Sequence, residues 1–422
     1  MKTLKLISAG LLAAAVIGSA SAATINLHIT GSTAFRKALY TSLVAQLGGG
    51  GSGTARAAFV GAANGLLGSN QATFINSANG DTVYCCMAGS VGGVNWVANQ
   101  IPAATSLTAS TSSAWLSLSG NGTYTAPSVD LSTGGTPVAA ASAVFDGAQV
   151  ADVTMSDSLQ SSTPYNYSSP RKLADVSCGI VTFTFAKGKQ NGGISAAQYA
   201  AVSNMTPLAF QNLANNGAVP LSMFSGLEAD DTVDVVLTGR DNDSGTRLAA
   251  FAETGLGTVN ASNIQVKLLT SGGVDVGSAA GLVIDHTAIW GPSSNNGYAS
   301  GGNVKNTLQA TYNGTATDNI LGSAFVLVGY VGLGDTPGAA QQLTYNGVAY
   351  SAAATQAGSY TFWTKEHLMY RADKINANGA TNKTFADALA PVISANATAA
   401  AGLTLASMSV DRDYEGGVVY HQ

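Results

Sequence analysis

The chain has 422 residues, of which only 10% are Asp, Glu, Lys or Arg, and its formal net charge is −5. This length is sufficient for two domains, and the acidic balance argues against nucleic acid or an anionic membrane surface as a partner. Because charged side chains are so few, solubility must depend on Ser, Thr, Asn and Gln.

The first 22 residues have the pattern of a secretory signal peptide. Lys2 and Lys5 form a charged start, residues 6–16 form an apolar core, and Ala20-Ser21-Ala22 is a small-residue cleavage site. The apolar run is shorter than a membrane-spanning helix, and no later stretch is long and apolar enough to span a bilayer. We therefore expect a periplasmic or secreted mature protein with no membrane insertion after cleavage.

The first candidate binding motif is Ile29–Tyr40, ITGSTAFRKALY, in which Gly31-Ser32-Thr33 precedes a helical pattern. Free N–H groups at a helix start carry partial positive charge, and Gly lets a ligand approach them closely. The motif is thus suited to an anion. Gly-Ser-Thr clusters are also ordinary turns and helix caps, so this motif alone does not decide between the two interpretations.

One further helix start and one strand end could serve the same anion. Gly89–Val94, GSVGGV, opens a helix expected over Val94–Ile101, and Ala151–Asp157, ADVTMSD, is a strand-like run that ends in a lone carboxylate. Without other information, Asp157 could also be a helix cap just past a strand. With a third Gly/Ser/Thr helix start at Ser244-Gly245-Thr246, these helix starts and Asp157 could converge on one small tetrahedral anion.

An uncharged insertion separates Ser90 from Asp157. Residues 82–129 contain no Asp, Glu, Lys or Arg, and Leu107–Val138 is rich in Ser, Thr and Gly. We expect a β-hairpin or a long surface loop here. It could act as a lid near the site or be plain decoration, since long loops are tolerated at low cost.

Strands and helices alternate along the chain, which favours α/β layers. Cys178–Ala186 is expected to carry the chain from a first lobe to a second, and Ser359–Tyr370 to bring it back. Two crossings predict a hinged clamshell with its site in the interlobe cleft. The predicted lobes are 23–186 with 357–422, which includes the insertion near 100–145, and 187–356. Other expected elements are helices at 194–203, 207–215 and 384–393 and a strand at 324–331.

The most informative segment is Val233–Thr246, VDVVLTGRDNDSGT. An alternating apolar strand ends near Arg240, and Ser244-Gly245-Thr246 then opens a helical pattern over Arg247–Glu253. Helix N–H groups and two hydroxyls offer donors, and a guanidinium can bind an oxyanion with two parallel hydrogen bonds.

The sequence gives little support for enzyme chemistry. The four His residues show no metal-ligand spacing, and no nucleophile motif accompanies them, so we predict no catalytic residues, no metal and no cofactor. Of the three cysteines, Cys178 could form a disulfide with Cys85 or Cys86 in an oxidising compartment, or all three could be buried free thiols.

Taken together and in this order, the motifs resemble those of the periplasmic phosphate-binding protein of bacterial phosphate ABC transporters, in the type 2 periplasmic-binding superfamily. The resemblance departs in two respects. Ser90 and Asp157 lie farther apart than in that family, and Ala34 stands where the family often has a hydroxyl residue, which Ser32 or Thr33 could supply instead. The phosphate-binding residues that the resemblance implies are Ser32, Thr33, Ala34, Phe35, Ser90, Asp157, Arg240, Ser244, Gly245 and Thr246.

The resemblance implies a monomeric exported solute-binding protein that binds inorganic phosphate for ABC-type uptake, with an ABC permease as its potential partner. Asp157 would accept a hydrogen bond from protonated phosphate and repel sulfate, which carries no proton at neutral pH. Two alternatives remain open: a phosphate sensor or scavenger without a transporter, and a surface structural protein on the same fold that has lost the ligand.

Overall fold

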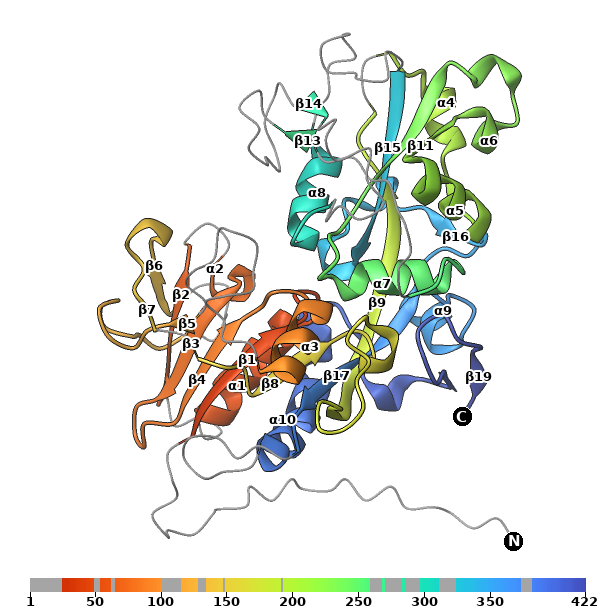
Figure 1. Cartoon of the computed structure of the whole chain (residues 1–422). Helices are drawn as coiled ribbons and strands as arrows, with labels where there is room; N and C mark the ends of the chain where they lie inside the picture. The colour runs from red at the N-terminus through yellow and green to blue at the C-terminus, as the bar shows by residue number, and fades with distance from the viewer. Residues whose placement is uncertain are drawn as a thin grey trace, which may run out of the picture.

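The computed structural model describes residues 25–48, 54–61, 65–100, 115–127, 134–146, 149–190, 193–258, 268–269, 283–284, 297–310, 324–372 and 382–422. They form two lobes of strands and helices, one above the other in Figure 1. The predicted α/β class is confirmed. The predicted signal peptide lies outside the described residues. None of the helices in the described part of the chain combines the length and the apolar character needed to cross a bilayer.

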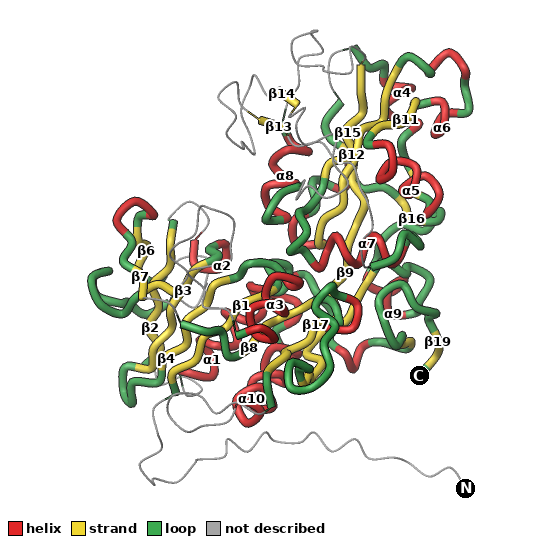
Figure 2. Tube along the Cα trace, viewed as in Figure 1, coloured by secondary structure: helices red, strands yellow, loops and turns green. Residues whose placement is uncertain are grey.

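One 11-stranded sheet runs through both lobes (Figure 2). In spatial order its strands are β11 (Ala218–Pro220), β12 (Val233–Thr238), β15 (Ala324–Gly332), β9 (Ala174–Lys187), β17 (Trp363–Tyr370), β8 (Val153–Ser156), β1 (Asn26–Gly31), β4 (Thr82–Cys86), β3 (Gln71–Asn76), β2 (Ala55–Val60) and β6 (Thr136–Val138).

The remaining strands are short and pair outside this sheet. They are β5 (Trp115–Leu116) with β7 (Phe145–Asp146), β10 (Asn204–Met205) with β16 (Thr344–Tyr345), β13 (Leu268–Leu269) with β14 (Val283–Ile284), and β18 (Val410–Asp411) with β19 (Tyr420–His421).

The helices in the described part of the chain are α1 (Arg36–Leu47), α2 (Gly65–Gly68), α3 (Ser90–Asn99), α4 (Ala196–Ala201), α5 (Pro207–Asn216), α6 (Ser222–Ser225), α7 (Gly245–Glu253), α8 (Gly301–Gln309), α9 (Ala352–Gln356) and α10 (Asn382–Ala395). Several helices pack against the sheet, among them α1, α3 and α10 in the first lobe and α5, α7 and α8 in the second. The bounds of α5 follow its local sequence, because Thr206 caps it, Pro207 occupies its first position and Gly217 ends it in the left-handed region.

Strand β9 belongs to both lobes. Its residues 174–182 pair antiparallel with β17, and its residues 183–187 pair antiparallel with β15. The chain returns beside this crossing, where the Phe183 N–H donates to the Phe362 carbonyl at 3.0 Å. These are the segments from which the sequence predicts the crossings, while the exact domain limits stay a prediction.

The carboxyl ends of the parallel strands face the interface between the lobes. In the first lobe β1 runs parallel to β4 and to β8, and in the second β12 runs parallel to β15. In open α/β sheets, ligands bind outside the carboxyl ends of the strands. The turns that follow β1, β4, β8 and β12 are therefore where a site is expected, and they carry the predicted binding residues.

The described part of the insertion is packed into the first lobe. Strand β6 pairs parallel with β2 at the edge of the sheet, and Leu116 is fully buried against Ala58 and Val138. The Trp115 indole N–H donates to the Gln149 carbonyl at 3.0 Å. In Figure 1 these short strands lie at the end of the lobe away from α7. Of the described residues of the insertion, β6 thus extends the main sheet and β5 pairs with β7 in a separate two-stranded antiparallel sheet, while residues 101–114 and 128–133 are not described.

The three cysteines are free thiols in the structure, and all three are buried. Burial raises the pKa of the Cys178 thiol well above its usual range, with a smaller contribution from nearby Glu366. Of the two possibilities that the sequence leaves open, the structure shows the free thiols.

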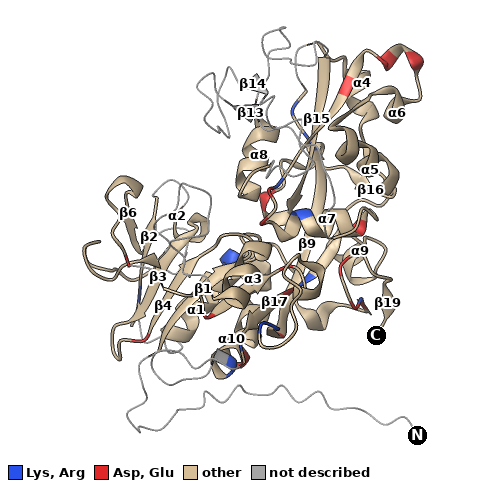
Figure 3. Ribbon diagram, viewed as in Figure 1, with Lys and Arg blue, Asp and Glu red and all other residues tan. Residues whose placement is uncertain are grey.

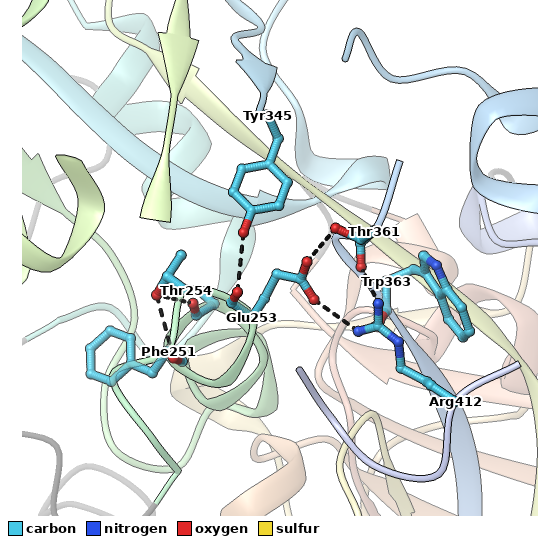
Figure 4. A network of polar contacts seen from close by, with 8 residues as sticks. Phe251, Glu253, Thr254, Tyr345, Thr361, Trp363 and Arg412 are labelled. Atoms are coloured by element: carbon cyan, nitrogen blue, oxygen red, sulfur yellow. Dashed lines mark hydrogen bonds and ion pairs between the residues drawn. The ribbon is translucent and has the colours of Figure 1, made fainter. Parts of the chain in front are cut away.

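A buried ion pair ties the C-terminal segment to the last turn of α7 (Figure 4). Arg412 Nη1 lies 2.8 Å from Glu253 Oε2, and the two side chains are only 3% and 8% exposed. Arg412 also donates to the Thr361 carbonyl at 2.7 Å, and its guanidinium lies 4.4 Å from the centre of the Trp363 ring. A helix of the second lobe is thereby fixed to the return strand and to the C-terminus.

We expect Arg412→Ala to lower the free energy of unfolding by about 3–5 kcal/mol, because it leaves the Glu253 carboxylate buried without its cation. Urea unfolding of the mature protein measures this. Lys383→Ala is the control, since the Lys383–Asp387 pair is exposed and should change stability little. A loss from Arg412→Ala no larger than that of the control would show that the pair does not hold the lobes.

Candidate functional site

The predicted binding side chains come together between the two lobes. Ser32, Ser90 and Asp157 from the first lobe and Arg240, Ser244 and Thr246 from the second are each at most 2% exposed. Charged residues are sparse along the ribbon (Figure 3), and Asp157 and Arg240 are among the few of them that are almost fully buried. Buried charges need partners or a function.

The turn after β1 places Ser32 and Thr33 differently. The Ser32 N–H donates to the Met155 carbonyl at 2.9 Å, and its hydroxyl accepts from the Phe35 N–H at 3.4 Å, so Ser32 orders the start of α1. The Thr33 hydroxyl instead lies 3.5 Å from Arg240 Nη2 in the other lobe. Of the two hydroxyls that could replace the one missing at Ala34, Thr33 is the one beside Arg240.

Ala34 and Phe35 contact the protein itself. The Phe35 ring is fully buried and occupies the space above Gly179 and Gly402, where a Cβ would overlap it. Ala34 packs against the core and lies next to Gly332 of the other lobe. The side chains at these two positions therefore pack within the protein.

Helix α3 begins at Ser90, four residues before its predicted start at Val94. Gly89 precedes it with φ +99°, a conformation that favours Gly, and a Cβ there would overlap the Asp243 carbonyl. The N–H groups of Val91 and Gly92 donate to that same carbonyl at 3.0 and 3.3 Å. The start of α3 is thus directed across the interface at the loop after β12.

Arg240 is held by backbone carbonyls and directed at hydroxyls of both lobes. Its Nε donates to the Tyr298 carbonyl at 3.0 Å and its Nη2 to the Ala299 carbonyl at 2.9 Å. Nη1 and Nη2 also reach Thr246 Oγ1 at 3.4 Å and Thr33 Oγ1 at 3.5 Å. These last two hydrogen bonds are long and weak, so an oxyanion between the lobes could replace them at little cost.

The second-lobe helix start is built as predicted. The Ser244 hydroxyl caps α7 by accepting from the Arg247 N–H at 3.2 Å, and Gly245 and Thr246 form its first turn. A Cβ at Gly245 would overlap the Asp157 carboxylate. Gly245 therefore lets the carboxylate of one lobe approach the first turn of a helix in the other.

Asp157 is the acceptor of this interface. Its N–H donates to Ser90 Oγ at 3.3 Å, but among the described residues its Oδ1 has no hydrogen-bond partner. Burial raises the pKa of Asp157 to about 6, although the Ser90 hydroxyl and the Arg240 charge act in the opposite direction. A buried carboxylate oxygen without a partner is costly, and it lies where a protonated ligand could donate to it.

Three residues at the interface were not predicted from the sequence. Asp243 supplies the carbonyl at the start of α3, and burial raises the pKa of its carboxyl to about 6. Arg36 opens α1, and its pKa is lowered first by burial and also by the Arg240 charge. Glu366 of β17 is fully buried, and because the neighbouring His367 pairs antiparallel with Ser156 of β8, Glu366 lies beside Asp157. The available signal was a carboxylate within the apolar strand pattern of Ser359–Tyr370.

The arrangement combines many donors with one carboxylate acceptor. Donors come from Arg240, from the first turn of α7 and from hydroxyls, and Asp157 is the acceptor, whereas the N–H groups of Val91 and Gly92 at the start of α3 already donate to the Asp243 carbonyl. This set suits one small tetrahedral oxyanion that still carries a proton. Because Asp157 lies directly against Gly245, such an anion can enter only if the two lobes separate slightly.

Comparison with known proteins gives structural likenesses at low identity. No protein-family profile matches the chain, and no curated protein matches it. The structure is similar to a putative phosphate ABC transporter substrate-binding protein from Clostridium perfringens with bound phosphate, at 11% identity and a TM-score of 0.44, covering 90% of this chain and 99% of the other.

Two further solved structures are similar over the same share of this chain. An ABC-type phosphate transport receptor from Vibrio cholerae has 11% identity and a TM-score of 0.42, covering 90% of this chain and 100% of the other. PstS from Borrelia burgdorferi has 10% identity and a TM-score of 0.38, covering 90% and 98%. These likenesses concern overall form, and each named ligand or partner is that of the other protein.

We expect Asp157→Asn to stabilise the ligand-free protein at neutral pH. Folding raises the pKa of Asp157. The protonated carboxyl therefore contributes to the free energy of unfolding in full below about pH 4, and this contribution is lost as the pH rises through about 6. The amide never ionises, so the variant should gain about 3 kcal/mol over wild type at pH 7.5 and nothing near pH 4.

Urea unfolding at both pH values measures this gain. The matched control is Asp146→Asn, in the insertion of the same lobe. A variant that is equally or less stable than wild type at pH 7.5 would show that the Asp157 carboxylate is not strained by its burial.

Proposed function

We propose that this protein is an exported solute-binding protein that binds inorganic phosphate between its two lobes. The observation that carries the proposal is Asp157, whose buried Oδ1 has no hydrogen-bond partner among the described residues and lies at the start of α7. Arg240, fixed by two backbone carbonyls, lies on the same interface. A site of this kind offers positive charge to an oxyanion and an acceptor to its proton.

The acceptor favours phosphate over sulfate. Phosphate at neutral pH keeps at least one proton, which can be donated to Asp157, whereas sulfate presents only lone pairs and negative charge. An unpaired buried acceptor facing a second acceptor costs at least the desolvation of both groups. Selectivity thus arises from rejection of the wrong anion as well as from binding of the right one.

The proposed roles follow the contacts of each residue. Arg240 and the first turn of α7, Ser244 to Thr246, would bind the anion from the second lobe. Ser90 and Thr33 would supply hydroxyls from the first lobe, while Ser32, Ala34 and Phe35 would order the start of α1 and present its N–H groups.

Transport is the biological role that we propose for this binding. A signal-like N-terminus and a phosphate site between two lobes suit a protein that delivers phosphate to an ABC permease. A sensor or scavenger without a transporter would use the same site. Permease and ATPase genes beside this one would favour uptake, whereas an absence of phosphate binding would favour the structural alternative.

Wild-type protein should bind phosphate at one site and prefer it over sulfate by about 4 kcal/mol or more, which corresponds to nearly a thousandfold difference in Kd. Asp157→Asn should weaken phosphate binding and tighten sulfate binding, because an amide can donate to a sulfate oxygen. Competition calorimetry with both anions at fixed ionic strength tests this. No binding of millimolar phosphate by the stripped wild-type protein would overturn the proposal.

Arg240→Ala should weaken phosphate binding by about 2–5 kcal/mol, as when one partner of a buried charge pair is removed. Arg240→Lys should also bind more weakly, because an ammonium group cannot make the two parallel hydrogen bonds of a guanidinium. Arg171→Ala, which removes an exposed arginine elsewhere on the first lobe, is the control. Wild-type affinity in Arg240→Ala would place the anion elsewhere.

A further inference from the structure

We propose that Glu366 is a positioning residue of the anion site, whose protonated carboxyl group beneath Ser32 leaves Asp157 as the only ionised carboxylate of the pair. This inference rests on the proposed function, because it explains how Asp157 stays available as an acceptor for a phosphate proton. Glu366 itself would not touch the ligand; it would act through Asp157 and Ser32.

The position of Glu366 in the sheet directs it under the site. On β17 it pairs with Gly179 of β9, and a register shift follows between Glu366 and His367. The Phe35 ring fills the space above Gly179, so Glu366 lies beneath the turn that leads into α1. It is fully buried, and among the described residues neither carboxyl oxygen makes a well-formed hydrogen bond, although the Ser32 hydroxyl lies nearby.

The charges around Glu366 oppose its ionisation. Burial is the main cause that raises the pKa of Glu366 well above its usual range, the Asp157 carboxylate adds to it, and the Ser32 hydroxyl only partly offsets both. Two neighbouring buried carboxyl groups cannot both ionise at ordinary pH. A bound phosphate anion adds further negative charge, so it strengthens the hold of Glu366 on its proton.

Among the described residues, the elements packed on this part of β17 bring no compensating cation to Glu366, and β8, which pairs with β17, carries no charged residue. On β9 the nearby titratable group is the Cys178 thiol, and α3 carries no charged residue. The charges of α10, Lys383 and Asp387, pair with each other and act on Tyr370 at the far end of β17.

Asp157 has a different environment. The Arg240 charge and the Ser90 hydroxyl favour its ionised form, while the Glu415 carboxylate opposes it. Glu415 is itself held by the Leu159 N–H at 2.7 Å and by the Ser162 hydroxyl. Of the two neighbouring carboxyl groups, only Asp157 has a guanidinium nearby. Asp157 is therefore the group that ionises, and Glu366 is the group that stays protonated.

The test uses Glu366→Gln, which keeps the size and the neutral charge of a protonated glutamate. Calorimetric titration with inorganic phosphate at pH 7.5 should give a Kd within about threefold of wild type. Infrared spectra of the phosphate-bound proteins should show the carbonyl stretching band of a protonated carboxyl group in wild type and its loss in Glu366→Gln. Glu228→Gln, an exposed carboxylate in the second lobe, should leave the band unchanged.

The outcomes separate the two proposals. If wild type binds phosphate but lacks the band, or if Glu366→Gln loses more than tenfold in affinity while melting like wild type, Glu366 is ionised and this inference is wrong. If wild type binds no phosphate at all, the proposed function fails, and the band measured without phosphate still decides where the proton lies.

Discussion

Strand β9 imposes the constraint on which the rest of the structure depends, because one continuous strand is hydrogen-bonded to β17 in the first lobe and to β15 in the second. The lobes therefore share a sheet and can move only by bending near residues 182–183 and the return segment beside them. This geometry turns the carboxyl ends of β1, β4, β8 and β12 toward one interface. Turns that are far apart in the sequence meet at this interface, and the proposed anion site is formed by these turns.

Contacts at one end of α7 stabilise the interface between the lobes, whereas buried carboxyl groups at the other end destabilise it. Asp157 and Glu366 are buried carboxyls with unpartnered oxygens, which costs folding free energy. At the other end of α7, Glu253 and Arg412 form a buried ion pair with additional hydrogen bonds to Thr361. Such a division is typical of binding sites, where local groups are arranged for a ligand and the surrounding contacts hold them in place.

The sequence predicts the parts of this site that are local in the chain. Ser244 and Thr246 stand at a helix start that follows a strand, so capping and periodicity are sufficient to place them. Glu366 and Glu415 could not be found in this way, because each acts on Asp157 from more than two hundred residues away. The start of α3 at Ser90 was missed because its two glycines disfavour a helix, and tertiary contacts with Asp243 outweigh that propensity.

Because this protein has few charged residues, the electrostatics of the interface depend on a small number of buried groups. In an acidic protein the overall field repels an anion, so attraction must come from Arg240 and from helix dipoles within the interface, where water screens them little. The same poor screening makes a second ionised carboxylate beside Asp157 prohibitive. In the proposed site, Asp157 can therefore accept a hydrogen bond from the anion only if the neighbouring Glu366 keeps its proton. The preference for phosphate at Asp157 thus depends on the protonation of Glu366.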